Sequence, residues 1–139
     1  MAVHNSFNSF NLALSRYGSH EVPEFQRGRL TVIALEGAKV LTELTPVDTG
    51  RAKGNWQFTV GRPAQGDVAR LDPSPEGVAG SHTTSDVLQN IKNWKPGQWV
   101  WFHNGLDYIA ILNDGTGGRT AHHMLERTKD HLERWVGQP

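Results

Sequence analysis

Apolar residues recur at helical spacing between residues 24 and 44, and charged residues fall largely on the other faces of that helix. The recurring positions are Leu30, Ile33, Gly37, Val40, Leu41 and Leu44. Pro23 suits a first helical turn, and Pro46 disfavours a helical Thr45, so prolines mark both ends. The pattern predicts one long amphipathic helix of roughly 20 residues, about 30 Å in length.

A second helical pattern closes the chain. Its apolar stripe consists of Ala121, Met124, Leu125, Thr128, Leu132, Trp135 and Val136. Charged residues occupy the remaining positions, and we expect favourable pairs between Glu126 and Lys129 and between Asp130 and Arg134. This helix is expected to pack on a sheet.

The segment after the long helix predicts a turn and then a strand. In the turn, residues 47–50, the Asp48 carboxylate can bond to nearby backbone amides and Gly50 can take a positive φ. Trp56, Phe58 and Val60 then alternate with polar residues, which is the period of a half-buried strand with one wet face.

A second strand is expected at residues 98–103, and Asn104-Gly105 after it is a strong signal for a two-residue hairpin. Both faces of that hairpin would be apolar, so it needs two covers. The long helix is one cover, and either a neighbouring subunit or a second helix of the same chain is the other. Periodicity also allows an alternative in which Tyr108, Ile111 and Leu112 lie on one side of a helical turn.

Between these strands, residues 61–84 are rich in proline and glycine and longer than an ordinary connection. We expect this long loop to reach beyond its own subunit, because so long a connection has no evident internal reason to exist. Residues 68–71 are a candidate return strand. Ser85 and Asp86 then indicate a helix start, followed by Val87, Leu88, Ile91 and Trp94 on one face.

The N-terminal residues leave two interpretations open. Phe7, Phe10, Leu12 and Leu14 fit a short helix that ends near Gly18, or an extended arm over residues 1–20 that grips a neighbour. The whole chain, 1–139, suits a single domain. We expect an α+β fold, with a mostly antiparallel sheet of three to five strands packed with the long helix and the C-terminal helix.

Composition narrows the functional classes. The chain has no cysteine, and 14 basic residues balance 14 acidic ones, so thiolate chemistry is excluded and nucleic acid is not implied as a partner by the totals. The N-terminal residues have neither a basic run nor a long apolar stretch, so we expect no membrane anchor.

Candidate chemistry is weak throughout. Residues 115–120 are glycine-rich before a helix but lack the ending of a phosphate-binding loop. His122, His123 and His131 with Glu126 lack the spacing of a metal-binding helix. Ser81-His82 and Ser19-His20 have no evident orienting carboxylate. We therefore expect no catalytic residues, no cofactor and no metal.

Two segments together resemble the minor tail component and neck family of tailed bacteriophages. The first is Thr45-Pro46-Val47-Asp48-Thr49-Gly50-Arg51 with Trp56 after it. The second is a looser box made of Asn104, Tyr108, Ala110, Leu112 and Gly115, followed by the last helix. The box departs from the family at Asn113-Asp114 and by an extra residue between Tyr108 and Ala110.

The resemblance implies a non-enzymatic virion protein of the neck or upper tail, assembled in the host cytoplasm. It implies a homo-oligomer, taken as a hexameric ring with a heterologous interface, next to head-completion, tail-terminator or tail-tube proteins. Double-stranded DNA would only pass through the lumen. The candidate interface residues are Trp99, Trp101, Tyr108, Asp48 and Arg51. The alternatives are a small nucleic-acid-binding module and a small hydrolase that uses the His-rich C-terminal helix.

Overall fold

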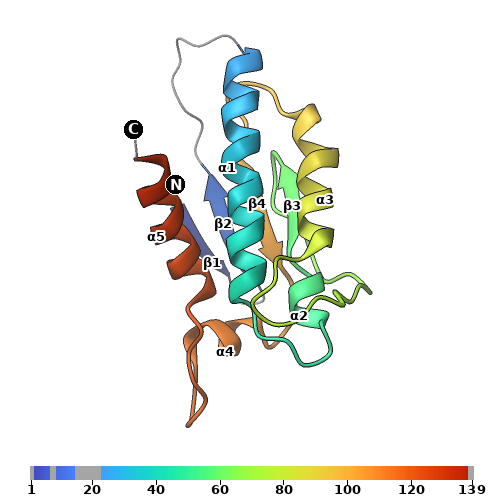
Figure 1. Cartoon of the computed structure of the whole chain (residues 1–139), viewed down its shortest axis with the longest axis vertical. Helices are drawn as coiled ribbons and strands as arrows, with labels where there is room; N and C mark the ends of the chain where they lie inside the picture. Colours follow the sequence, from blue (N-terminus) through green and yellow to red (C-terminus); the bar gives the residue numbers. More distant parts are fainter. Residues whose placement is uncertain (1, 7–8, 15–22, 138–139) are drawn as a thin grey trace.

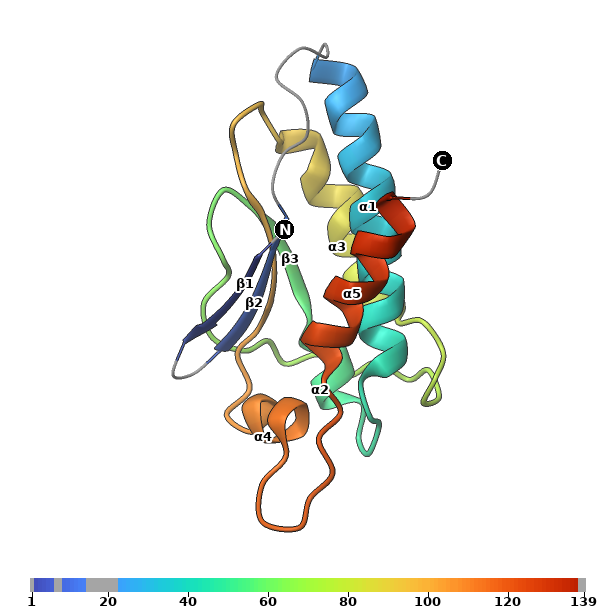
Figure 2. The same ribbon diagram turned by 90° about the vertical axis from the view of Figure 1, so that its left-hand side faces the viewer.

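In the computed structural model the described residues are 2–6, 9–14 and 23–137, drawn in colour in Figure 1. The helices α1 (Pro23–Leu44), α3 (Ser81–Asn90) and α5 (Met124–Val136) lie on one side of an antiparallel sheet, as Figure 2 shows. The sheet joins β1 (Ala2–Ser6), β2 (Ser9–Leu14), β4 (Val100–Asn104) and β3 (Gln57–Val60), in that spatial order. The expected α+β class and the antiparallel pairing are confirmed.

The long helix was predicted correctly, and α1 is the element on which the core is built. Its buried face consists of Leu30, Ile33, Ala34, Ala38 and Leu41. Gly37 lets two neighbours come close at once, because a Cβ there would lie 3.0 Å from the Phe102 ring and 3.3 Å from Leu132. Phe102 belongs to β4 and Leu132 to α5, so this glycine lets α1 pack against both the sheet and α5.

The C-terminal helix begins at Met124 rather than at Ala121. It packs mainly on α1 and also contacts β1 and β2, so the expected packing on the sheet covers only part of its buried face. The two ion pairs predicted within this helix are not the ones observed. Lys129 instead pairs with Glu133 at 3.1 Å, one turn further on.

A second polar contact fixes α5 to α1, where the His131 ring lies 2.9 Å from the Glu36 carboxylate. The two helices therefore share a polar contact beside their apolar one.

The predicted strand at Trp56, Phe58 and Val60 is present as β3, with Trp56 immediately before it. The predicted hairpin at Asn104-Gly105 is wrong. The chain leaves β4 at Asn104 and enters α4 (Ile109–Asp114), so the helical alternative for Tyr108, Ile111 and Leu112 is the correct one.

Asn104 and Gly105 do not form the predicted hairpin turn but make two other contacts. Asn104 is buried, and its Nδ2 donates to the Ala52 carbonyl at 2.8 Å while its Oδ1 accepts from the Leu106 amide at 3.2 Å. Gly105 is a glycine because a Cβ there would lie 2.1 Å from the Gly66 carbonyl oxygen. The pair thus serves a buried polar contact and a close backbone approach, not a positive φ.

The long loop is shorter than predicted, because α3 begins at Ser81 and not at Ser85. Residues 68–71 form no strand. The Thr83 hydroxyl donates to the Trp56 carbonyl at 2.7 Å, so the first turn of α3 is fixed by polar contacts that apolar periodicity does not reveal. Val87, Ile91 and Trp94 are buried as expected, whereas Leu88 is 55% exposed.

For the N-terminal segment, the short-helix interpretation is wrong at Phe10, Leu12 and Leu14, which lie in β2. These residues pair with β4 of the same sheet, so this part of the expected arm is a strand of the domain. Phe7 and Gly18 lie outside the described residues.

Replacing Gly105 with Ala should lower the free energy of unfolding by about 2–3 kcal/mol, because the new methyl group displaces the loop backbone at Gly66. Urea unfolding monitored by circular dichroism measures this change. Gly28→Ala is the matched control: its Cβ meets nothing within 4 Å inside α1, so it should stabilise by up to about 1 kcal/mol. Equal effects of the two substitutions would contradict the proposed close approach.

Candidate functional site

The two sequence segments that carry the family resemblance meet at one end of the molecule, the lower end in Figure 1. Trp56 is fully buried, and its Nε1 donates to the Thr45 hydroxyl at 2.9 Å. The Asn104 amide reaches the carbonyl of Ala52 in α2 (Arg51–Gly54). Residues 45–56 and 104–115 therefore form one continuous unit, which we call the motif end.

A cleft of about 380 Å³ opens at the motif end. It is lined by Pro46, Val47, Asp48, Thr49, Gly50, Arg51, Ala52, Tyr108, Leu112 and Arg119. Three of the five predicted interface residues, Asp48, Arg51 and Tyr108, thus share one site. Burial raises the pKa of the Tyr108 hydroxyl, the Arg51 charge lowers it and the Asp48 charge raises it, and the net shift is upward.

The turn that begins the cleft has the expected backbone but a different stabilising contact. Gly50 has a φ of 85°, as predicted. The Arg51 amide donates to the Thr49 hydroxyl at 3.3 Å, in the place where Asp48 was expected to act. Arg51 also pairs with Asp67 at 2.9 Å, and both side chains are about half exposed. Asp48 is exposed and lies at the rim of the cleft.

The other two predicted interface residues lie at the opposite end of β4. Trp99 and Trp101 have ring centroids 6.3 Å apart. Trp99 is 42% exposed, while Trp101 is partly buried and donates its Nε1 to the Gly61 carbonyl at 3.3 Å. The five candidate residues thus form two separate surfaces rather than one.

Residues 61–80 fold back on their own subunit through several polar contacts. Arg70 donates to the Trp56 carbonyl at 2.9 Å and pairs with Asp86 of α3 at 2.9 Å. The Val68 amide donates to Asn55 Oδ1 at 2.7 Å. The loop therefore has a structural role within its own domain. The premise that so long a connection has no internal reason to exist is wrong.

Asp72 is the most deeply buried carboxylate of this loop, 2% exposed, and it lies against the motif turn. Its amide donates to the Gly50 carbonyl at 3.0 Å, and its Oδ1 accepts from the Ser74 amide at 2.9 Å. Burial alone would raise the pKa of Asp72. The hydrogen bonds from Ser74 and the charges of Lys53 and His82 outweigh it, so the pKa is lowered from 3.8.

Lys53 is fully buried beside this carboxylate, and its Nζ donates to the Pro75 carbonyl at 2.9 Å. A fixed cation thus occupies the space behind the turn. The sequence does not reveal this lysine as a core residue, because its neighbours in the loop, Asp72 and Pro75, come from about 20 positions away.

The histidine-rich segment does not form a shared site. The His131 ring faces Glu36, while His123 lies 3.8 Å from Glu126. Across residues 2–6, 9–14 and 23–137, no group of three or more His, Asp or Glu side chains is placed to hold a metal ion.

Of the two serine–histidine pairs, Ser81-His82 lies in the first turn of α3. The His82 ring contacts the Leu71 carbonyl at 3.0 Å, and Ser19-His20 lies outside the described residues. Residues 115–120 form an exposed loop before α5, and sequence reasoning missed Arg119 within it as a cleft residue. Its position after three glycines carried no signal for that contact.

Comparisons with known proteins give no relative for this chain. No protein-family model matches the sequence, and no curated protein or solved structure matches it significantly. Among the described residues, no helix is both long enough and apolar enough to cross a membrane.

Replacing Asp72 with Asn should lower the free energy of unfolding at neutral pH by about 1–3 kcal/mol, because the Ser74 hydroxyl and amide then lose a charged acceptor and Lys53 loses a nearby negative charge. The folded pKa lies below 3.8, so the carboxylate contributes stability above that value and loses it as the pH falls through the folded pKa. The difference between wild type and variant in urea unfolding should therefore shrink below about pH 4.

The half-exposed Asp67→Asn serves as the control for this experiment. Its ion pair with Arg51 is exposed, so the loss should stay below about 1 kcal/mol. If the difference in free energy of unfolding between wild type and Asp72→Asn stays the same down to about pH 2, the Asp72 charge is not involved.

Proposed function

We propose that this protein is a structural subunit of a tailed bacteriophage virion, a ring-forming protein of the neck or upper tail that catalyses no reaction. One observation carries the proposal. The two resemblance segments, about 50 residues apart in the sequence, join through the Trp56–Thr45 and Asn104–Ala52 contacts into one surface with a cleft. A chance resemblance in two unrelated loops would have no reason to converge in this way.

The family residues fall into two roles in this proposal. Thr45, Gly50, Trp56 and Asn104 build the motif end from inside, and each is buried. Asp48, Arg51 and Tyr108 are exposed around the cleft, where a neighbouring subunit can contact them. The sheet of three to five strands is also part of the proposal, with β1 and β2 extending the β3–β4 pair.

The proposed assembly is a homo-oligomeric ring, taken as hexameric, between head-completion and tail-terminator or tail-tube proteins. Double-stranded DNA passes through its lumen without being read, and the protein needs no cofactor. A heterologous interface closes such a ring, because one surface of each subunit pairs with a different surface of the next. The two separate groups of candidate residues, around Trp99 and around Tyr108, fit this requirement.

The function is tested by deleting the coding sequence from the genome that carries it and imaging the resulting particles. We expect DNA-filled heads and separate tails, with joined particles restored when the wild-type protein is supplied in trans. If the deletion still produces normal tailed particles, the proposal is wrong. Peptides of this protein should also be detected in purified virions.

Trp99→Ala should leave the fold intact and weaken subunit association by about 2 kcal/mol, roughly 30-fold, as truncation of an interface tryptophan often does. Circular dichroism checks the fold, and analytical ultracentrifugation measures association. Trp99→Phe is the control, since it keeps most of the apolar area and should lose much less. If Trp99→Ala assembles as wild type does, Trp99 does not belong to the interface.

A further inference from the structure

The charges of this neutral chain are separated along its long axis. One end consists of the start of α1, the end of α3, the 3-10 helix η1 (Ile91–Asn93) and the turn into β4, at the top of Figure 1. Arg27 donates to the Trp94 carbonyl at 3.2 Å, and the Gly61 amide donates to the Trp99 carbonyl at 2.7 Å, which brings these segments together. The basic residues of this end are Arg27, Arg29, Arg62, Lys92 and Lys95, and Glu24 is the one carboxylate among its described residues. We call it the basic end.

The motif end has the opposite charge. Its carboxylates near the surface are Asp48, Asp67, Glu76, Asp107 and Asp114. Arg51 and Arg119 are the basic residues at its cleft, and Arg51 is already paired with Asp67. The same segments hold the buried Lys53, which lies against the buried Asp72, and Arg70, which pairs with Asp86 of α3, so the excess of negative charge comes from the exposed carboxylates. The total charge of zero in the sequence therefore hides two ends of opposite sign.

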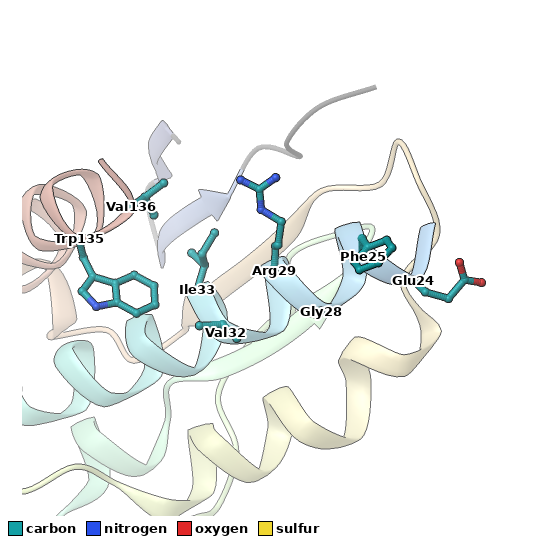
Figure 3. Close-up of a pocket in the computed structure, with 8 residues that line it drawn as sticks. All are labelled: Glu24, Phe25, Gly28, Arg29, Val32, Ile33, Trp135 and Val136. Atoms are coloured by element: carbon teal, nitrogen blue, oxygen red, sulfur yellow. The ribbon is translucent and has the colours of Figure 1, made fainter. Parts of the chain in front are cut away.

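Both ends also expose large apolar side chains. The basic end carries Phe25, Val32, Leu88 and Trp99, and Phe25 is 70% exposed. A groove of about 450 Å³ runs from this end along α1 to the end of α5. Figure 3 shows Phe25 near the start of α1, and Val32 and Ile33 further along the helix beside Trp135 of α5. The motif end exposes Leu71, Val78, Tyr108 and Ile111. Each end thus combines apolar contact area with charge, which is the composition of a specific protein interface.

The β3 edge of the sheet is closed to a neighbour. The Trp56 carbonyl accepts from Thr83 and Arg70, and the Phe58 carbonyl accepts from the Asn90 amide at 2.8 Å. Side chains therefore occupy the carbonyl of Trp56, just before β3, and that of Phe58 within it, and α3 packs against this strand. A sheet continued from β1 of one copy to β3 of the next is thus not available.

We propose that the basic end of one copy of this chain docks on the motif end of a second copy. Lysines and arginines around Trp99 and the Phe25 groove then face the aspartates around Tyr108, so the charges guide and orient a contact whose affinity comes from the apolar side chains. The contact is heterologous, because the two ends differ, and it generates a ring when the rotation closes. The inference deepens the proposed function by naming the two surfaces of its interface, and it rests on that function only for ring closure.

Two double charge reversals test the pairing. Lys92→Glu with Lys95→Glu makes the basic end acidic, and Asp48→Lys with Asp107→Lys makes the motif end basic. All four side chains are exposed, so each variant should fold. We expect each variant alone to self-associate at least tenfold more weakly than wild type in sedimentation velocity. Mixing the two variants should restore association, because each then presents the end that the other lacks.

Lys39→Glu with Lys129→Glu is the matched control, since Lys39 is exposed in α1, Lys129 is about one third exposed in the middle of α5, and the net charge changes as in the lysine variant. This control should associate as wild type does, and wild-type association should weaken by at least tenfold in about 0.5 M NaCl. A mixture no stronger than its components, or a control as weak as the end variants, overturns the inference. A wild type that stays monomeric and binds duplex DNA through the lysines of its basic end overturns it as well.

The test separates this inference from the proposed function. Rings that form equally well in wild type and both end variants overturn the end-to-end pairing and leave the neck assignment intact. End-to-end association of a protein whose deletion leaves normal tailed particles keeps the pairing and removes the neck assignment.

Discussion

The motif end depends on backbone segments that approach each other more closely than any side chain would allow. Residues 66–72 cross Gly50, Gly54 and Gly105 so closely that a Cβ on any of them would lie within 2.5 Å of a backbone oxygen. This contact holds the turn before α2 and the exit from β4 against one loop. The cleft exists because the loop fixes both of its walls, and Asp72 with Lys53 fills the space behind them. The long connection is therefore the support of the candidate site rather than an appendage to it.

Much of the fold follows from the sequence where one periodic pattern dominates. The long helix, the strand at Phe58 and the last helix each carry enough apolar residues at one spacing to decide the element. The failures share a cause. Asn104-Gly105 has the composition of a hairpin turn, but its amide and its missing side chain serve contacts with residues about 40 to 50 positions away. The start of α3 was missed because its first turn is polar and is fixed by a hydroxyl that reaches the Trp56 carbonyl. Local patterns cannot report contacts of this range. For the same reason, the sequence pointed to Asp48, Arg51 and Tyr108 but gave no sign of Arg119 or of the loop behind them.

Charge shows the same difference between totals and placement. Residues 87–106 contain two lysines and no carboxylate, and in the fold they join the arginines at the start of α1. Four of the five exposed carboxylates named at the motif end lie in three loops that are far apart in the sequence. A balanced composition therefore argues against an electrostatic field of one sign over the whole protein, but it does not exclude fields of opposite sign at its two ends. The ends lie some 30 Å apart, which is the length of α1 from its rise per residue. At ordinary ionic strength such ends are screened from each other, and each acts on what lies directly against it.

Two features limit how copies of this chain can meet. Polar side chains occupy the carbonyls of Trp56 and Phe58 at the β3 edge, and α1 buries its apolar face inside the domain between the sheet, α3 and α5. Among the side chains of residues 24–137, the large exposed apolar ones are concentrated at the two ends, with Trp99 at one and Tyr108 at the other. A pairing of one end with the same end of a second copy would bring like charges together, either five basic side chains against five or the aspartates against themselves. A heterologous pairing avoids that repulsion, and it is the type of contact that a closed ring of identical subunits requires. The charge separation and the proposed ring thus lead to the same pair of surfaces from independent observations.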